Sequence, residues 1–242
     1  MGGIIHAYYD CVSPYSFFAF THLEKVRGVL ASHGVRIETH PIFLGGIMNG
    51  SGNKPPWSLP AKANLGRLEL QRAIRYWKVE PFSMPNFFPI LTILPQRALT
   101  YIKHTYPSTQ FENTFGLYWQ WFLYKHRDIS KPDVLRELLS SPEAGFSREQ
   151  TEEILTAAMT DKRWKEALTA KTQEALNRGA FGAPFFWVVK TDDTDADVDV
   201  DGQGKVVGEE PFFGSDRFHQ MWEYLGLPFE DIKLLPRAEA KL

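Results

Sequence analysis

The order of local patterns in the first 43 residues limits the fold more than any other feature of the chain. Residues 4–9 have the pattern of a strand, residues 14–32 that of a helix, and residues 35–43 that of a second strand. A strand, a helix and a strand at this spacing form a βαβ unit, whose two strands run parallel. We therefore predict an α/β protein that begins with a parallel strand pair.

The rest of the chain divides into a helical block and a second segment that contains strands. A glycine- and proline-rich stretch at 44–60 predicts a loop without lasting regular structure, and residues 62–178 have helical spacing almost throughout. Residues 184–190 and 204–214 then predict strands, and residues 215–226 predict a closing helix.

Without the helical block, the order is βαβ followed by ββα, which is the thioredoxin arrangement. We therefore predict a thioredoxin-like fold with a large all-helical domain inserted between its two halves. Residues 1–60 and 179–242 would form the thioredoxin-like domain, and residues 61–178 would form the inserted helical domain.

The four residues Ser-Pro-Tyr-Ser stand at the junction of the first strand and the first helix. Ser13 is suited to cap that helix and Pro14 to take its first position. Reactive sulfur enzymes place Cys-Pro-x-Cys at such a junction, whereas here both sulfurs are replaced by hydroxyls. The single cysteine, Cys11, excludes an internal disulfide and a cysteine-based zinc cluster, and we expect it to be structural, like Ser16.

Composition and charge exclude several functional classes. The net charge of −2 and the pI of about 6.4 provide no basic surface for nucleic acid. No apolar run approaches the roughly 18 residues of a membrane span, and the early first strand leaves no room for a leader peptide. We therefore expect a soluble, intracellular protein.

Metal sites are not expected from residue spacing. The seven histidines are scattered and form neither a paired-ligand motif nor a catalytic dyad; they are His6, His22, His33, His40, His104, His126 and His219. The aspartate-rich stretch at 191–202 lacks the final glutamate of a calcium loop, and we expect a solvated hairpin tip there.

Four motifs together resemble the kappa-class glutathione transferases, relatives of the DsbA-type disulfide oxidoreductases and of 2-hydroxychromene-2-carboxylate isomerase. They occur in order along nearly the whole chain: YYDCVSPYSFFAF, IMNGSGNKPPWSLPAK, NRGAFGAPFF and FFGSDR. The resemblance implies glutathione as cosubstrate, no metal, a homodimer, and residence in mitochondria or peroxisomes. The last three residues, Ala240-Lys241-Leu242, resemble a peroxisomal address for the import receptor, with a cytoplasmic location as the remaining possibility.

Ser13 is the expected catalytic residue. A free thiol of pKa about 8.5 is only slightly ionised at neutral pH. A hydroxyl that donates to S⁻, placed at a helix N-terminus, favours the thiolate without forming a disulfide with it. Tyr15 is the rival hydroxyl, because other transferase classes use tyrosine, and helix capping alone is the structural alternative for Ser13.

Other site residues follow from the resemblance. It implies that Pro184 is cis, that the backbone of Ala183 pairs with the cysteinyl part of glutathione, and that Asn53 and Lys62 hold the glycyl carboxylate. Ala183 stands where many relatives have a larger aliphatic residue, so the electrophile pocket can differ in shape.

Ser215 and Asp216 are predicted to start the closing helix, with Ser215 or Asp216 as its cap. Free N–H groups at that start bind a carboxylate, and Asp216 can take the ammonium of the γ-glutamyl end. Tyr15 and Trp57 are expected to line the electrophile pocket.

The predicted function is a glutathione transferase that activates glutathione as a thiolate for attack on small apolar electrophiles, a detoxification reaction. One alternative is a glutathione-dependent isomerase of the 2-hydroxychromene-2-carboxylate type. The other is a glutathione- or lipid-binding protein without turnover. Nucleic acid and membrane partners are not expected.

Overall fold

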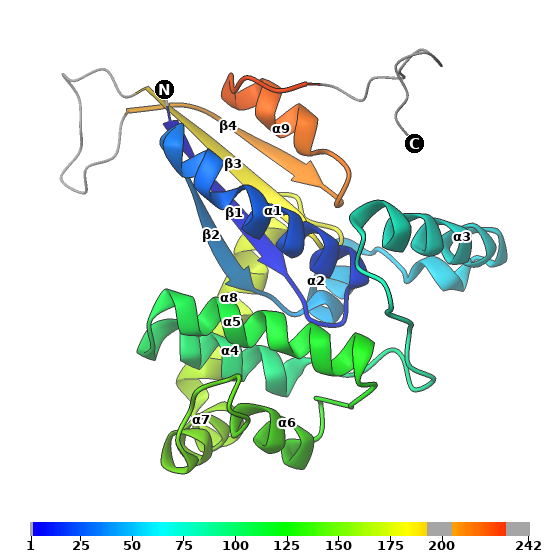
Figure 1. Cartoon of the computed structure of the whole chain (residues 1–242), viewed down its shortest axis with the longest axis vertical. Helices are drawn as coiled ribbons and strands as arrows, with labels where there is room; N and C mark the ends of the chain where they lie inside the picture. The colour runs from blue at the N-terminus through cyan, green and yellow to red at the C-terminus, as the bar shows by residue number, and fades with distance from the viewer. Residues whose placement is uncertain (1, 193–204, 231–242) are drawn as a thin grey trace.

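The structure is a computed structural model, and it describes residues 2–192 and 205–230. One sheet has the strand order β2-β1-β3-β4 (Figure 1). Its strands are β1 (Gly2–Tyr9), β2 (Val35–Pro41), β3 (Phe185–Asp192) and β4 (Lys205–Phe213). β1 pairs with β2 in parallel and with β3 antiparallel, and β4 pairs antiparallel with β3. The predicted parallel pair is confirmed.

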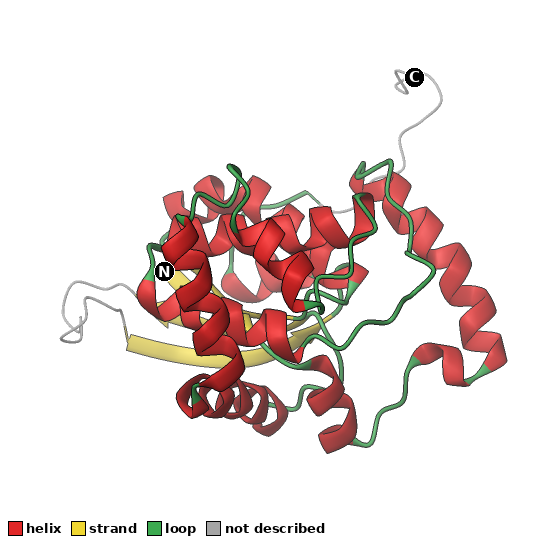
Figure 2. Cartoon of the chain, turned by 90° about the horizontal axis from the view of Figure 1, so that it is seen from below, coloured by secondary structure: helices red, strands yellow, loops and turns green. Residues whose placement is uncertain are grey.

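Helices surround this sheet on both faces (Figure 2). They are α1 (Pro14–Ser32), α2 (Leu44–Ser51), α3 (Pro60–Trp77), α4 (Ile93–Thr105), α5 (Ser108–Trp119), α6 (Pro132–Leu139), α7 (Arg148–Thr160), α8 (Lys162–Asn177) and α9 (Phe218–Leu225). Two short segments complete the set, a 3-10 turn η1 (Pro56–Ser58) and a π-helical segment η2 (Gln120–Tyr124) that continues α5. The predicted order of βαβ, helices and ββα is therefore confirmed.

The two faces of the sheet are covered differently. On one face, Ile5 and Tyr9 of β1 pack in a large core with residues of α1, α5 and α9, among them Phe18, Phe115 and Met221. This core runs continuously into the helical segment, and its aromatic side chains contact one another in edge-on, tilted and stacked pairs; Tyr9 meets Phe115 edge-on.

The opposite face of the sheet has a smaller apolar core and more polar side chains. Tyr8 and Phe185 pack there with Ile47 of α2 and Ala175 of α8. The Tyr8 hydroxyl donates to Glu174 of α8 at 2.6 Å. Helix α8 therefore crosses the polar face of the strand pair, although it belongs to the predicted insert.

Helix α2 corrects the prediction of an irregular segment at 44–60. Glycine disfavours helices, but here three glycines make close packing feasible. A Cβ at Gly50 would lie 2.6 Å from a methyl carbon of Leu176, and one at Gly46 would lie 3.2 Å from Thr172. Contact with α8 thus outweighs the low helix propensity of the segment.

The start of α9 corrects a second prediction. The helix begins at Phe218 with Arg217 as its N-cap residue, and no side chain caps it. Gly214 has a φ of 92°, a value that L-residues rarely adopt. The chain makes a turn there, so Ser215 and Asp216 precede the helix and do not cap it.

Among the described residues, no helix combines the length and the apolar character needed to cross a membrane. The predicted hairpin tip lies largely outside the described residues, and so does the C-terminal tripeptide 240–242.

Candidate active site

Ser13 lies where β1 leads into α1, and its hydroxyl forms two hydrogen bonds. The Oγ atom accepts from the Ser16 N–H at 3.1 Å, which caps the helix, and donates to the Ala183 carbonyl at 3.0 Å. Ser13 as a whole is 5% exposed. The cap predicted from Ser-Pro is confirmed, and the hydroxyl also contacts a segment 170 positions later in the chain.

The first turn of α1 offers a donor site for an anion. Pro14 has no N–H, the Ser16 N–H is bound to Ser13 Oγ, and the Phe17 N–H is bound to the Ser13 carbonyl at 3.2 Å. The Tyr15 N–H is left without a partner in the part of the chain that the structure describes. That amide, the Ser13 hydroxyl and the positive end of the helix dipole lie together.

The segment at 181–184 forms the other side of this junction. The peptide bond between Ala183 and Pro184 is cis, as the resemblance implied. The Pro184 carbonyl accepts from the Gly214 N–H at 3.1 Å, which joins the segment to the turn before α9. Ala183 is half-buried, and its carbonyl has a second lone pair that can accept a ligand N–H besides the Ser13 hydroxyl.

A buried carboxylate, Asp10, holds the loop between β1 and Ser13. It accepts from the Val12 N–H at 3.0 Å, the Leu44 N–H at 2.7 Å and the Thr92 hydroxyl at 2.8 Å. The backbone carbonyl of Asp10 also accepts a hydrogen bond from the Ser13 N–H. Burial raises the pKa of Asp10 to about 6, although the three donors lower it.

Sequence reasoning did not single out Asp10. An acidic residue that directly follows a buried apolar strand was a usable signal, because such a carboxylate needs donors to satisfy it. Its role is to position three segments of the site: the loop before Ser13, the start of α2 and the start of α4.

Tyr15 and Asp216 lie on the solvent side of the junction. Burial raises the pKa of the Tyr15 phenol, and the charges of Glu69 and Asp216 raise it further. The phenol therefore stays protonated and can donate but not act as a base. Asp216 is largely exposed and pairs with Arg217, whereas Ser215 is buried.

Asn53, Lys62 and Trp57 follow α2 and lead into α3. The Asn53 side-chain amide donates to the Phe181 carbonyl at 2.7 Å, so this loop contacts the segment that contains the cis bond. Lys62 is exposed in the first turn of α3. Trp57 is 49% exposed and packs edge-on against Phe88, with ring centroids 5.4 Å apart.

These positions can be compared with known proteins. The family description "DSBA-like thioredoxin domain" matches residues 4–226. The chain belongs to the DsbA-like thioredoxin family.

Similar proteins extend over nearly the whole length of the chain. Glutathione S-transferase kappa 2 of Caenorhabditis elegans is 26% identical over 236 residues, covering 94% of this chain and 93% of that protein. Human glutathione S-transferase kappa 1 is 28% identical over 227 residues, covering 92% and 90%. The predicted resemblance to the kappa class is confirmed.

A solved structure of 2-hydroxychromene-2-carboxylate isomerase has a similar fold. It aligns with a TM-score of 0.69 at 20% identity, covering 92% of this chain and 94% of that chain. At this identity the likeness concerns the DsbA-like fold alone.

Cysteine chemistry is disfavoured at this DsbA-like junction. Cys11 is fully buried and has no disulfide partner. Burial is the main cause that raises the pKa of its thiol, and the nearby Asp10 raises it further. Such a thiol is inert compared with the exposed, ionised cysteines of redox sites.

A cavity of about 480 Å³ lies beside the predicted site and not within it. It is lined by residues between the end of α2 and the end of α8, including Ser51, Leu176 and Phe181. None of the predicted site residues lines it. The donor site at Ser13 is therefore a feature of the β1–α1 junction and is separate from this cavity.

Proposed function

We propose that this protein is a glutathione S-transferase that stabilises glutathione as a thiolate and directs it at small apolar electrophiles. The observation that supports this most directly is the Ser13 hydroxyl at the N-terminus of α1, beside the unpartnered Tyr15 N–H. Both groups donate hydrogen bonds, so the junction is suited to an anion. The similarity to kappa-class transferases over more than nine-tenths of the chain supports glutathione as the source of that anion.

The hydrogen-bond donors at the junction can supply the free energy that is needed to lower the thiol pKa of glutathione. Lowering the thiol pKa by about two units requires about 2.7 kcal/mol of differential stabilisation. A hydroxyl that donates to a charged acceptor contributes about 1.5–3 kcal/mol, and a helix N-terminus adds about 0.3–1 kcal/mol. The Ser13 hydroxyl and the helix start together cover the requirement.

The proposed activation step uses the hydrogen bond that Ser13 now forms. Its hydroxyl turns from the Ala183 carbonyl to the sulfur, while the Ser16 N–H continues to donate to Oγ. The thiol proton leaves to solvent. With 1-chloro-2,4-dinitrobenzene, the thiolate forms a carbon–sulfur bond, the carbon–chlorine bond breaks, and chloride leaves with the bonding electrons.

The backbone of Ala183 is proposed to pair with the cysteinyl part of glutathione, next to the buried Pro184. Asn53 is fixed beside this segment through its bond to Phe181, and Lys62 is exposed in the first turn of α3, so both are proposed for the glycyl carboxylate. A lysine ammonium acts there as a point charge.

The opposite end of the tripeptide is proposed to lie at the turn before α9. The largely exposed Asp216, which also pairs with Arg217, is proposed to bind the γ-glutamyl ammonium, and Ser215 the carboxylate. Tyr15 and the exposed Trp57 are proposed to border the electrophile.

The test is an ultraviolet titration of the thiolate in bound glutathione. We expect an apparent pKa about two units below that of the free thiol in the wild type, and a return toward the free value in Ser13→Ala. Ser13→Thr keeps the hydroxyl and should keep the depressed pKa. Ser13→Asp keeps a capping oxygen but has no proton to donate at neutral pH, so it separates helix capping from activation. An unchanged titration in Ser13→Ala would refute the proposal.

The two alternatives predicted from the sequence are separated by product assays. Conjugate formation with 1-chloro-2,4-dinitrobenzene supports the transferase, whereas turnover of a chromene carboxylate alone supports the isomerase. Tight glutathione binding with an unshifted thiol pKa and no product in either assay supports a binding protein.

A homodimer is proposed with α3 at the interface. Leu65 and Leu68 are at least half exposed, Tyr76 is 67% exposed, and helix α3 extends away from the body of the molecule (Figure 1). Burial of such a stripe by a second copy would be favourable. Sedimentation of wild type against a Leu65→Glu, Leu68→Glu double variant tests this, since a wild-type monomer would contradict it.

Peroxisomal import through Ala240-Lys241-Leu242 is proposed from the sequence alone. A fluorescent protein fused to the N-terminus of the full chain should enter peroxisomes. Removal of the last three residues should leave it outside them.

A further inference from the structure

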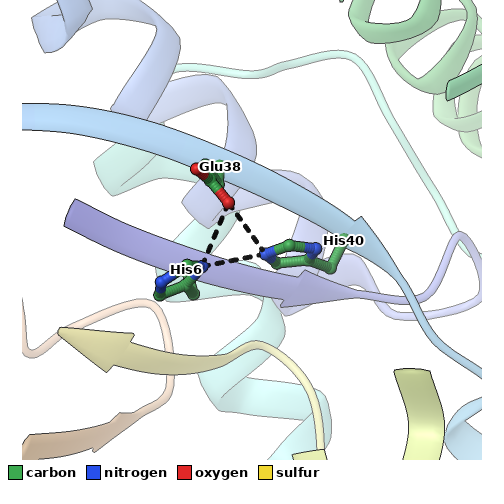
Figure 3. A group of neighbouring side chains, drawn as sticks. All are labelled: His6, Glu38 and His40. Atoms are coloured by element: carbon green, nitrogen blue, oxygen red, sulfur yellow. Dashed lines mark hydrogen bonds and ion pairs between the residues drawn. The ribbon is translucent and has the colours of Figure 1, made fainter. Parts of the chain in front are cut away.

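Three potential metal ligands converge on the polar face of the sheet. In the parallel pairing of β1 and β2, His6 is opposite Glu38 and Tyr8 is opposite His40. Alternate residues of a strand point to the same face, so the side chains of His6, Glu38 and His40 lie together on the side that α8 covers (Figure 3). We call these three residues the histidine–glutamate cluster.

The ligand atoms of the cluster have the spacing of a metal site. His6 Nδ1 lies 3.1 Å from His40 Nε2 and 3.3 Å from Glu38 Oε2, and His40 Nε2 lies 3.8 Å from Glu38 Oε2. The point in the plane of the three atoms that is equidistant from them lies about 2.0 Å from each, which is the length of a zinc bond to imidazole or carboxylate. Tetrahedral coordination places the ion out of that plane, so the 3.8 Å separation of His40 Nε2 and Glu38 Oε2 must shorten to about 3.3 Å when zinc binds. The two ring nitrogens now point toward each other, with the ring centroids 5.3 Å apart, so both rings must turn to aim their lone pairs at a shared ion.

We propose that His6, Glu38 and His40 bind one Zn²⁺ ion per chain. Three protein ligands leave the fourth tetrahedral position to water. None of these residues belongs to the proposed glutathione site, so this inference does not depend on the proposed function. It reverses the expectation from residue spacing, because the ligands come together through strand pairing and not through a local motif.

The surroundings of the cluster determine which metal it suits. Glu38 is its only negative charge, and the other carboxylate oxygen pairs with Arg36. Behind His40, the Lys103 ammonium donates to Nδ1 at 3.0 Å and to the Thr39 carbonyl at 2.7 Å. A site with so little negative charge does not suit calcium or magnesium, which need several oxygen ligands. Two neutral imidazoles favour zinc.

The cluster is both ordered and accessible. The His40 side chain is 6% exposed and stacks on the Tyr8 ring, with centroids 4.9 Å apart. The His6 and Glu38 side chains are 17% and 31% exposed, and β2 lies at one edge of the sheet. An ion can therefore enter from the His6 and Glu38 side without unfolding the protein.

Proton balance follows from the hydrogen bonds. Since Lys103 donates to His40 Nδ1, the proton of the neutral His40 ring is on Nε2. When a zinc ion binds Nε2, that proton leaves to solvent and Lys103 passes one of its own protons to Nδ1, so His40 stays a neutral imidazole whose Nδ1–H donates to the uncharged Lys103 amine.

The experiment uses the full chain with its purification tag removed. Equilibrium dialysis against Zn²⁺ and metal analysis give the stoichiometry, and competition with a chromogenic chelator gives the affinity. We expect one Zn²⁺ per chain and a higher melting temperature with the ion present. Glu38→Gln and His6→Gln should each weaken binding by at least tenfold, with far-UV circular dichroism confirming that they fold.

The matched control is His219→Gln on α9, which packs against the other face of the sheet. It should bind Zn²⁺ like the wild type. Replacement of Zn²⁺ by Co²⁺ should give the intense visible spectrum of a tetrahedral site. The proposal is overturned if the wild type retains no Zn²⁺, if Glu38→Gln and His6→Gln bind it equally well, or if the cobalt spectrum is that of an octahedral ion.

Discussion

Strand β1 serves two regions of opposite chemical character. At its carboxyl end, the Ser13 junction presents donors: a hydroxyl, a backbone amide and the positive end of a helix. In its middle, the histidine–glutamate cluster presents lone pairs of two imidazoles and a carboxylate. The first suits an anion such as a thiolate, and the second suits a cation. One strand can provide both because helix starts expose N–H groups, whereas the face of a strand exposes only its side chains.

Asp10 places an acceptor, a buried carboxylate, at the donor-rich end of β1. Its titration gives the largest effect that we expect, a change of the free energy of unfolding with pH. Its pKa of about 6 lies above the value of 3.8 for an unperturbed group. The folded state therefore holds the proton more tightly, and the free energy of unfolding should fall as the pH rises from about 4 to about 6. The loss amounts to about 3 kcal/mol. Asp10→Asn should lack this pH dependence.

Urea unfolding of both proteins between about pH 3 and about pH 7, which extends about a unit beyond each pKa value, measures the difference. If the free energy of unfolding changes with pH in the same way in the wild type and in Asp10→Asn, the Asp10 carboxylate is not destabilised by burial. The contrast between the donor-rich Ser13 junction and the histidine–glutamate cluster would then be weaker, because the junction would tolerate a carboxylate of its own.

Ser13→Ala should lower kcat/KM for glutathione conjugation by about ten- to a hundredfold, because it removes the hydroxyl's share of thiolate stabilisation, about 1.5–3 kcal/mol, and leaves the helix N-terminus in place. It should leave the Zn²⁺ affinity unchanged, because the two regions share no residue. Steady-state kinetics and the chelator competition on the same preparation test both statements. A loss of Zn²⁺ binding in Ser13→Ala would show that the regions are coupled through β1.

Lys103→Met should strengthen Zn²⁺ binding by about tenfold, because it removes a positive charge that faces His40. The thiol pKa of bound glutathione should not move. The same competition titration measures the first effect and the ultraviolet titration the second. Weaker Zn²⁺ binding would mean that Lys103 orders His40 more than its charge repels the ion.

Ser147→Ala provides the smallest effect and the reference for the others. Ser147 Oγ accepts from the Gln150 N–H at 3.1 Å, and the Gln150 side chain accepts from the Ser147 N–H at 2.8 Å, a capping box at the start of α7. Its loss should cost about 1 kcal/mol of unfolding free energy. Neither thiolate formation at Ser13 nor Zn²⁺ binding at the histidine–glutamate cluster should change. A change in one of them would indicate that a loss of global stability alone affects that site.

Much of this molecule follows from local patterns in the sequence. The strand, the Ser13 cap and α1 depend on residues within a few positions of one another, and all were predicted correctly. The capping box at the start of α7 likewise depends on only four consecutive residues, Ser147 to Gln150. The division at residues 60 and 179 stays a prediction.

The features that were missed depend on contacts between distant segments. Helix α2 forms because its glycines pack against α8, and the turn at Gly214 moves the start of α9 past Ser215 and Asp216. His6 and His40 meet only through the register of two strands. Residue spacing along one segment carries no information on any of these contacts.

The hydrogen bond from Ser13 to Ala183 has a consequence for protein synthesis. The residue that completes the junction is translated 170 positions after the serine. Until then β1 also lacks β3, its second neighbour in the sheet, and one edge of the strand stays unpaired while the intervening helices emerge from the ribosome. A stalled nascent chain would therefore be inactive and prone to aggregation. Chaperone demand should drop abruptly once the segment after residue 185 has left the exit tunnel.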